Sequence, residues 1–322
     1  MELVLDRVSK QFGSAIAVDR VSAAFGPGVY GLLGANGAGK TTLMRMICDV
    51  LKPTSGSVLW NGAPISRLGA DYRSQLGYLP QDFGYYPEFT AIDFMMYLSA
   101  LKGLDSKTAR RRSYELLHLV GLRDVAKRKV RTFSGGMKQR LGIAQAVIND
   151  PSVLVLDEPT AGLDPKERVR FRNLIASLAQ DKVVMLSTHI VSDVEYIADE
   201  ILVMKAGSIM ATGTVEEIVQ GVAGCVWECV MAPREADAMA ARTTVGNLHY
   251  DRDGMAVVRL VSKTRPHEAA RQVTPTLEDV YLYLFDERWA RRAPASRIAE
   301  RKGAPPWVAW SSTRSRRSSR AA

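Results

Sequence analysis

The 322-residue sequence has few cysteines and no long apolar run, and each shortage excludes a class of protein. Its three cysteines, Cys48, Cys225 and Cys229, are too few and too unevenly spaced for a disulfide framework. No apolar stretch approaches the roughly 20 residues that a membrane-spanning helix needs. The first residues, MELVLDRVSK, lack the basic-then-apolar pattern of a signal peptide. We therefore expect reduced thiols, a cytoplasmic location and membrane contact only through a partner.

The net charge of +9 is concentrated in one segment, which weakens the case for nucleic acid as a partner. Residues 286–322 hold ten Lys or Arg against three Asp or Glu, a net charge of +7, so the rest of the chain carries only +2. The segment is rich in Ser, Ala and Pro, which is typical of disordered, solvated chain. Contact with nucleic acid or an anionic membrane surface is the alternative, and Trp307 and Trp310 favour the membrane. We expect no nucleic-acid partner.

Strand-like apolar segments alternate with helical segments through the first two thirds of the chain. This order predicts an α/β fold with a mostly parallel sheet covered on both faces. Residues 85–150 have only helical patterns and predict an inserted helical subdomain, whereas short strands and helices after residue 222 predict a small α+β appendage. The predicted domains are 1–222, 223–285 and a basic tail at 286–322. The main strands are expected at 3–8, 29–33, 57–60, 153–157 and 183–187.

A phosphate-binding loop follows the second of these strands. The segment GANGAGKT at Gly34–Thr41 matches G-x-x-x-x-G-K-[ST] between a strand and a helix, the context that the motif requires. Its backbone N–H groups and the helix N-terminus favour phosphate. Lys40 can reach the β- and γ-phosphates, and Thr41 can ligate Mg²⁺. The residues expected to hold the nucleotide here are Gly34, Asn36, Gly37, Ala38, Gly39, Lys40, Thr41 and Thr42.

Two carboxylates end the apolar strand VLVLD, in the segment VLVLDEPT at 153–160. Ligands of parallel sheets collect at the carboxyl ends of strands, so Asp157 is expected in the Mg²⁺ shell. Glu158 is expected to polarise the attacking water. The alternative is a carboxylate pair that only caps the next helix. The sequence has no N-K-x-D segment to read guanine, so ATP is favoured over GTP.

A second helix start of the kind that binds anions lies in FSGGMKQR at Phe133–Arg140. Ser134 can offer its hydroxyl there, and Gly135 and Gly136 can offer their N–H groups. The helix that follows is well marked, because Met137, Leu141, Ala144 and Ile148 fall on one face. No Lys-Thr pair follows the glycines, so this segment is not a second phosphate loop of the first kind.

Together the motifs GANGAGKTT, FSGGMKQR, VLVLDEPTAGLD and STH resemble the nucleotide-binding subunit of an ATP-binding cassette (ABC) transporter, over roughly residues 1–222. The resemblance implies that Phe12 stacks on adenine and that Gln81 contacts Mg²⁺ and the attacking water. It also implies that Asp164 lies in a loop at a dimer interface and that His189 contacts the γ-phosphate. Core packing for Phe12, a surface position for Gln81 and a structural role for His189 are the alternatives.

In the resembled family, the loop containing Ser134, Gly135 and Gly136 binds the γ-phosphate of ATP held by a second subunit. Two chains then meet head to tail, so each chain needs both helix starts and a single chain should hydrolyse ATP poorly. Phe133 and Met137 stand where the family has Leu and Gln in L-S-G-G-Q. We expect Met137 to weaken the site without abolishing it, unless it only packs on the apolar face of its helix.

The C-terminal segment PTLEDVYLYL resembles that of ATPases that partner drug, antibiotic or polysaccharide exporters. The resemblance implies export through a separate ABC-2-like membrane permease of about six spans, which places the chain on the inner face of the plasma membrane. A second ATP-binding subunit, identical or not, is expected. The alternatives are a ribosome- or nucleic-acid-associated ABC protein and a soluble ATPase such as those of iron–sulfur assembly.

Overall fold

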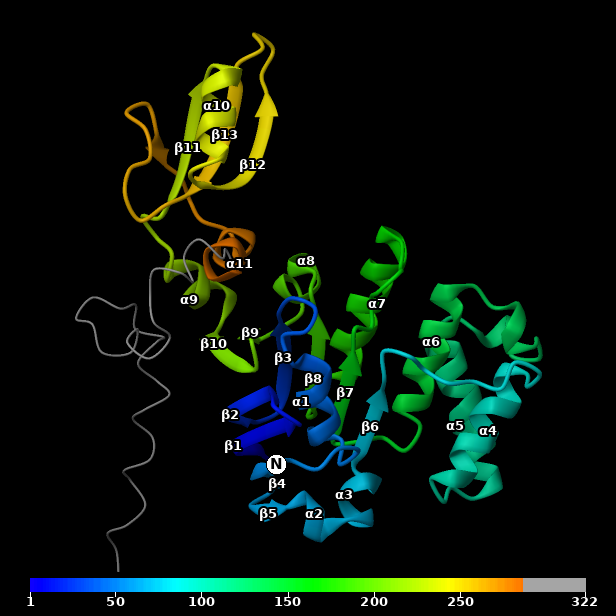
Figure 1. The fold of residues 1–322 in the computed structure, drawn as a ribbon. Helices are drawn as coiled ribbons and strands as arrows, with labels where there is room; N and C mark the ends of the chain where they lie inside the picture. The colour runs from blue at the N-terminus through cyan, green and yellow to red at the C-terminus, as the bar shows by residue number, and fades with distance from the viewer. Residues whose placement is uncertain (286–322) are drawn as a thin grey trace, which may run out of the picture. The chain divides into compact units, whose positions relative to one another are not determined.

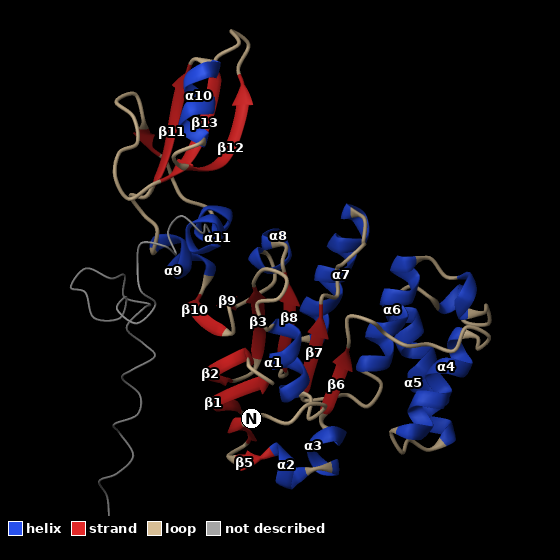
Figure 2. Ribbon diagram, viewed as in Figure 1, coloured by secondary structure: helices blue, strands red, loops and turns tan. Residues whose placement is uncertain are grey.

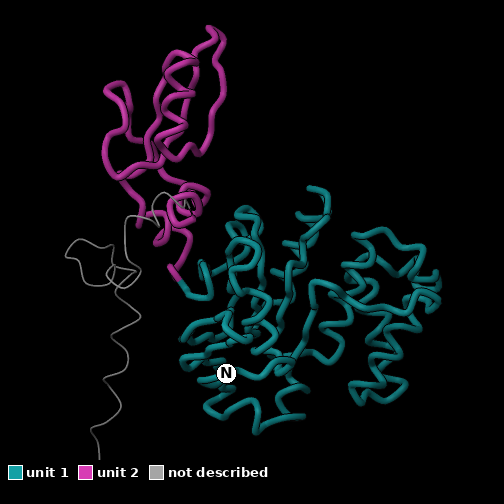
Figure 3. The backbone as a smooth tube through the Cα atoms, viewed as in Figure 1, with its two compact units in different colours: residues 1–209 teal, residues 210–322 magenta. Residues whose placement is uncertain are grey.

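The computed structural model describes residues 1–285, and the chain divides into two compact units, residues 1–209 and the part from residue 210 onward (Figure 3). Each unit is described by itself. This division falls before the domain boundary expected at residue 222, and the expected functional domains remain a prediction. The expectations for the tail, including Trp307 and Trp310, fall at 286–322 and lie outside the described residues.

A six-stranded sheet forms the centre of the first unit (Figures 1 and 2). The pairs β3–β8, β3–β9, β7–β8 and β6–β7 are all parallel, as the alternation of strands and helices predicted. All residues of β7 and β8 are buried, which explains their uninterrupted apolar sequences. The strand order is β10(Ser208–Gly213), β9(Glu200–Lys205), β3(Gly28–Leu33), β8(Val183–Thr188), β7(Val153–Asp157) and β6(Leu76–Leu79).

A second, antiparallel sheet was not predicted from the sequence. Its order is β2(Ala15–Phe25), β1(Leu3–Phe12), β4(Ser55–Trp60) and β5(Ala63–Pro64). Helix α1(Lys40–Ile47) packs with both sheets in one core, because Met44 and Ile47 share a buried cluster with Leu5 of β1 and Val155 of β7. One face of the parallel sheet is therefore covered by a helix and a further sheet.

The segment predicted as a helical subdomain contains α4(Ala91–Leu101), α5(Ser106–Leu119) and α6(Gly135–Ala146). All three helices begin at side chains that cap their first N–H groups: Thr90 forms a capping box with Asp93, Asp105 accepts from two backbone N–H groups, and Ser134 accepts from one. The remaining helices of the unit are η1(Arg123–Val125), η2(Val130–Thr132), α2(Ile65–Leu68), α3(Ala70–Ser74), α7(Pro165–Leu178) and α8(Val191–Glu195).

The second unit contains a four-stranded sheet with its own core. Trp227 and Cys229 of β11 pack with Ala236 of α10 and Val258 of β13. The sequence predicted an α+β segment here but not strands β12 and β14. The sheet order is β12(Thr244–Tyr250), β13(Ala256–Val261), β11(Val226–Met231) and β14(Arg271–Gln272), and the helices are α9(Val215–Gln220), α10(Pro233–Ala240) and α11(Leu277–Phe285). Within residues 1–285, no helix is both long and apolar enough to cross a membrane.

Candidate functional site

The phosphate loop connects the end of β3 to the start of α1, and its glycines occupy positions that a side chain would disturb. Gly37 and Gly39 have φ values of 80° and 105°, in the left-handed region that favours glycine. A Cβ on Gly39 would lie 2.2 Å from the Ala17 carbonyl oxygen, and one on Gly34 would lie 2.4 Å from that of Met204. The loop is thus held closely against the surrounding backbone at Gly34 and Gly39, and it is exposed at Asn36 and Gly37.

Lys40 is buried at the first position of α1, although it carries a charge. Its Nζ donates to the carbonyl oxygens of Gly34 at 2.7 Å and Ala35 at 3.3 Å, and it lies 3.3 Å from Glu158 Oε1. The lysine and glutamate side chains are 5% and 6% exposed, so the charges of both are neutralised within the site. The two motifs far apart in the sequence are therefore in direct contact.

Asp157 ends β7, where Ser187 of β8 is its neighbour in register. Its Oδ1 accepts from Ser187 Oγ at 2.6 Å and from Thr41 Oγ1 at 3.2 Å. Its Oδ2 is buried and has no hydrogen-bond partner. A buried, unpartnered carboxylate oxygen beside a threonine hydroxyl is the oxygen ligand set that a hard divalent cation such as Mg²⁺ takes, so these residues fit the ion. Burial raises the pKa of Asp157 and outweighs the hydrogen bonds from Ser187 and Thr41, which lower it, so this pKa lies above its usual value.

Glu158 follows in a conformation that non-glycine residues rarely adopt, with a φ of 49°. Its backbone N–H donates to Ser187 Oγ at 2.9 Å. Both carboxylate oxygens have partners, because Oε1 faces Lys40 and Oε2 lies 2.9 Å from Nδ1 of His189. His189 follows the end of β8, and its side chain is 43% exposed. The structure thus gathers Lys40, Thr41, Asp157, Glu158 and His189 in one cluster.

The second helix start is formed as the sequence predicted. Ser134 caps α6, and its Oγ accepts from the N–H of Met137 at 3.3 Å. Phe133 is buried and anchors the loop, whereas Ser134 and Gly135 are exposed. Met137 is half-buried, while Leu141, Ala144 and Ile148 of the predicted apolar face are buried. In Figure 1, β7 and β6 lie between α1 and α6, so the two helix starts are separate in this chain.

The loop expected at a dimer interface ends at Asp164, which caps α7 by accepting from the N–H of Glu167 at 2.8 Å. Glu167 in turn forms an ion pair with Arg140 of α6. A Cβ on Gly136 would lie 3.5 Å from the Glu167 side chain. The start of α7 therefore lies beside the start of α6. Ser134, Gly135 and Gly136 thus belong to the same surface as Asp164.

Phe12 and Gln81 lie apart from these bonded clusters. Phe12 ends β1 and is 51% exposed, which agrees with a stacking surface and not with core packing. Gln81 is exposed two residues beyond the end of β6. Because Leu79 of β6 pairs with Leu156 of β7, Gln81 leaves the sheet at the same edge as Asp157 and Glu158. In the phosphate loop, Asn36 is exposed, Ala38 is buried and Thr42 is half-buried.

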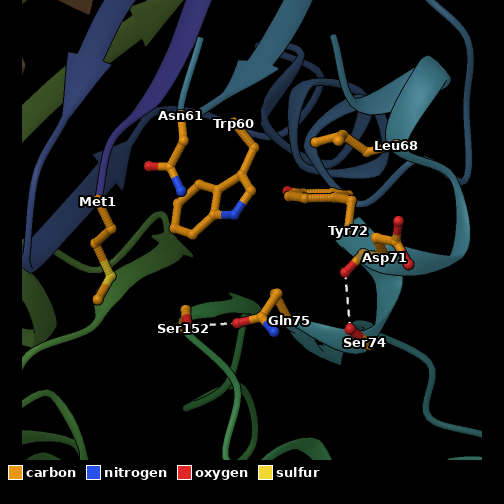
Figure 4. Close-up of a pocket in the computed structure, with 9 residues that line it drawn as sticks. All are labelled: Met1, Trp60, Asn61, Leu68, Asp71, Tyr72, Ser74, Gln75 and Ser152. Carbon is orange, nitrogen blue, oxygen red and sulfur yellow. Dashed lines mark hydrogen bonds between the residues drawn. The ribbon is translucent and has the colours of Figure 1, made fainter. Parts of the chain in front are cut away.

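A pocket of about 540 Å³ lies at the opposite edge of the parallel sheet (Figure 4). Gln75 and Ser152, which line it, precede β6 and β7, and Ser152 Oγ bonds Gln75 Oε1 at 2.7 Å. Trp60 and Tyr72 form another wall, with ring centroids 6.3 Å apart. In a parallel sheet ligands collect at the carboxyl ends of strands, so this pocket is not the candidate nucleotide site.

Sequence reasoning missed Ser187, which donates to the Asp157 carboxylate and accepts from the Glu158 backbone N–H. The signal was a small polar residue at the end of an apolar strand, immediately before the Thr-His pair. Recognising that Ser187 lies beside Asp157 required knowing that β7 and β8 are neighbours in the sheet, which no local sequence pattern reveals. Thr160 was missed for the same reason: its hydroxyl bonds the buried Asp193 of α8.

A phosphate loop that follows β3 of a parallel sheet and contacts an Asp-Glu pair at the end of β7 defines the α/β P-loop NTPase class. The ABC transporter family matches residues 18–161. An uncharacterized ABC transporter ATP-binding protein of Synechocystis is 34% identical over 270 residues, 80% of this chain and 75% of that protein. The Nod factor export ATP-binding protein I of Burkholderia orbicola is 33% identical over 288 residues, 86% and 94% of the two chains.

The chain belongs to the ABC transporter family and is an ATP-binding subunit, an ATPase by family. Among solved structures, a dimeric bacterial ABC transporter cassette aligns with a TM-score of 0.61 at 26% identity, over 66% of this chain and 98% of that one. The same cassette in a dimeric post-hydrolysis state with ADP and phosphate aligns with a TM-score of 0.60 at 25% identity. The family resemblance and the α/β fold predicted from the sequence are confirmed.

Proposed function

We propose that this protein hydrolyses ATP to drive export of a drug, antibiotic, lipid or polysaccharide through a separate membrane permease. The observation that carries the ATPase part is the buried contact of Lys40 with Glu158, which brings the phosphate loop to the carboxylate pair. Export is supported by relatives named for Nod factor export, one of which aligns over 94% of its length. Relatives named as transporter subunits disfavour a soluble scaffold or ribosome-associated ATPase.

The nucleotide is expected to lie along the phosphate loop, with adenine against the exposed ring of Phe12 and the phosphates at the start of α1. Lys40 would leave the Gly34 and Ala35 carbonyl oxygens to meet the β- and γ-phosphates. Thr41 and Asp157 Oδ2 would hold Mg²⁺, together with Gln81 from the neighbouring strand end. When bound, the ion neutralises charge that develops on the phosphate oxygens.

Hydrolysis is in-line attack of water on the γ-phosphoryl group, with bond formation to the water oxygen and loss of ADP as the leaving group. Glu158 would accept a hydrogen bond from this water and orient it, and His189 would contact the γ-phosphate. In the structure Glu158 Oε2 lies 2.9 Å from His189 Nδ1, and Glu158 Oε1 lies 3.3 Å from Lys40 Nζ. Entry of the γ-phosphate therefore has to separate Glu158 from Lys40, which makes the glutamate available to water.

A complete site is proposed to need two chains, whether identical or different. Ser134, Gly135 and Gly136 would bind the γ-phosphate held by the partner's phosphate loop, with Asp164 at the interface. Closure of the two subunits around ATP, and opening after hydrolysis, would move the permease between two orientations. The protein would then lie in the cytoplasm on the inner face of the membrane, held there by its permease.

The deciding experiment reconstitutes the chain with a candidate six-span permease, such as one encoded beside it, in inside-out vesicles. We expect the two to co-purify from membranes and to take up a fluorescent drug or a labelled polysaccharide only with ATP and Mg²⁺. Glu158→Gln should abolish this uptake while the complex still purifies. Co-purification with ribosomes in place of a membrane protein, or uptake that continues in the Glu158→Gln complex, would overturn the proposal.

A further inference from the structure

Ser187 is the one described residue whose side chain bonds both Asp157 and Glu158. It is fully buried near the end of β8, directly across from Asp157 in the parallel register. Its Oγ donates to Asp157 Oδ1 at 2.6 Å and accepts from the Glu158 N–H at 2.9 Å. A hydroxyl has a single proton to donate, so with that proton on the carboxylate its lone pairs remain for the N–H.

The bond to Asp157 determines which carboxylate oxygen remains free. A hydrogen bond to an ionised carboxylate is short and about twice as strong as one between neutral groups. Ser187 and Thr41 both donate to Oδ1, and Oδ2 is left buried without a partner. Without the serine hydroxyl only the longer bond from Thr41, at 3.2 Å, would hold Oδ1, so the carboxyl group would be freer to rotate about its Cβ–Cγ bond and turn Oδ2 away from a cation.

The bond from Glu158 determines where the second carboxylate is presented. The N–H of Glu158 takes the Ser187 side chain as its acceptor at the point where β7 ends. There the backbone enters the left-handed region, with a φ of 49°, a strained conformation that persists only where the surroundings hold it. Because this turn carries the glutamate side chain to Lys40 and His189, a loss of the N–H bond would loosen its position.

We propose that Ser187 is a positioning residue for ATP hydrolysis, whose single hydroxyl orients both the cation-binding oxygen of Asp157 and the backbone of Glu158. The inference rests on the roles proposed above for these two carboxylates. A merely structural serine would support folding, and its loss would affect nucleotide binding and turnover together. A positioning serine acts on Mg²⁺ affinity and turnover, and leaves metal-free nucleotide binding in place.

The test uses the full-length chain with three substitutions at this position. Ser187→Ala removes the hydroxyl, Ser187→Cys keeps the volume but offers only a weak donor, and Ser187→Thr keeps the hydroxyl. Ser99→Ala is the matched control, because Ser99 is also fully buried and makes a 2.7 Å bond, to the Met95 carbonyl oxygen in α4. For each variant the binding of a fluorescent ATP analogue with and without Mg²⁺, kcat and KM for ATP, and the melting temperature are measured.

We expect Ser187→Ala and Ser187→Cys to lower kcat and the apparent Mg²⁺ affinity by about 10- to 100-fold, the usual effect of losing a group that orients a metal ligand. Metal-free nucleotide affinity should stay within about twofold, because the serine does not touch the phosphate loop. Ser187→Thr should recover most of the lost kcat. The control should match the unsubstituted chain.

The inference is overturned if Ser187→Cys turns over ATP at the normal rate, because then only side-chain volume matters. It is also overturned if Ser187→Ala loses metal-free nucleotide binding in proportion to kcat. Should the alanine variant fail to fold, the contrast between the cysteine and threonine variants decides alone. Failure of the proposed function would show elsewhere, as ATP turnover in the unsubstituted chain that is absent or is unaffected by Glu158→Gln.

Discussion

The Glu158 carboxylate lies between Lys40 on one side and His189 on the other. Loss of its charge should therefore affect nucleotide binding and ATP turnover differently. We expect Glu158→Gln to bind ATP at least as tightly as the unsubstituted chain, because an uncharged amide releases Lys40 for the phosphates. Hydrolysis should fall by about 10²- to 10⁴-fold, the range for loss of general-base assistance. Equilibrium binding of a fluorescent ATP analogue and phosphate release separate the two effects.

A suitable control is Glu115→Gln, which removes the charge of an exposed glutamate on α5 that pairs with Arg111. It should leave both quantities unchanged. Normal turnover in Glu158→Gln would remove Glu158 as the residue that orients the attacking water.

Two glycines of the phosphate loop should respond to substitution by alanine in different degrees. At Gly39 the added Cβ would lie 2.2 Å from a backbone oxygen that cannot move aside, in addition to the strained φ. At Gly37 an added Cβ would have no neighbouring atom within 4 Å, so the strained φ is the sole penalty. This strain amounts to about 1–2 kcal/mol. We expect Gly39→Ala to abolish ATP binding and Gly37→Ala to weaken it by about 10-fold, measured by titration calorimetry.

Gly37→Ala, once shown to be folded, is the control for Gly39→Ala, because both variants add the same methyl group to the same loop. Equal loss in the two variants would contradict the close approach of Gly39 to Ala17. The folded state of each is checked by circular dichroism before affinity is compared.

The site residues that could be identified from the sequence are those that stand next to one another in a recognisable motif. Lys40 and Thr41 follow the glycines of one loop, and Asp157 and Glu158 end one strand, so local order was enough to find them. Ser187 was not found because its partners are 30 and 29 residues away and meet it only through strand pairing. Its place at the end of an apolar strand was visible in the sequence, but its bonds to the Asp157 carboxylate and the Glu158 N–H were not.

Helix α11 is joined to the four-stranded sheet β12–β13–β11–β14, here called the accessory sheet, by an ion pair between the half-buried Arg259 and the buried Asp279. Arg259 of β13 bonds both oxygens of Asp279, with Nε at 3.0 Å from Oδ1 and Nη2 at 2.7 Å from Oδ2. Thr276 also donates to Asp279, from its N–H and its hydroxyl. Burial alone would raise the pKa of Asp279, but the bonds from Arg259 and Thr276 outweigh it, so this pKa is lowered.

A lowered carboxyl pKa gives stability above the pKa of the unfolded chain, about 3.9, that is lost as the pH falls through the folded value. We expect Asp279→Asn to destabilise the accessory sheet by about 3–5 kcal/mol at pH 7, because Arg259 is left without its anionic partner. The difference from the unsubstituted chain should shrink as the pH falls below about 4. Hydrogen exchange of β13 amides, corrected for intrinsic rates, measures both effects locally.

Arg271→Gln provides the comparison, because the Arg271 side chain is 75% exposed in its pair with Glu228. Its removal should change stability by about 0–1 kcal/mol at most. A pH-independent penalty in Asp279→Asn would show that packing of α11, and not the ion pair, holds the helix.

The parallel strands were predictable because they are buried on both faces and therefore read as short apolar runs. Strands β1 and β4 of the antiparallel sheet were expected, but β2 and the sheet itself were not, because β1 and β2 alternate irregularly. Their register shifts between Leu5 and Val8 and again before Gln11, and Arg7 and Arg20 have positive φ values. Such irregularities move side chains between faces and break the two-residue period on which strand prediction depends. Strand β12 has a similar shift between Val245 and Asn247.

The two helix starts that are predicted to bind anions have different partners within one chain. The start of α1 faces Glu158 and contains the lysine, whereas the start of α6 is exposed and linked to α7 through Arg140 and Glu167. A head-to-tail pair of chains would bring each exposed α6 start to the other chain's phosphate loop. In that arrangement every active site draws its two halves from different chains, so damage to one half can be complemented by the other chain.

Mixing two inactive variants tests this directly. Lys40→Ala removes the lysine that is proposed to bind phosphate, and Ser134→Arg fills the start of α6, so each variant alone should lack ATP turnover. If both are mixed in equal amounts and pair at random, half of the dimers are mixed and each contains one intact site. About a quarter of the unsubstituted activity should then return, if the two sites of a two-fold dimer act independently. Phosphate release measured against total chain concentration gives the fraction, and a mixture that stays inactive under conditions in which cross-linking shows mixed dimers would place both halves of the site in a single chain.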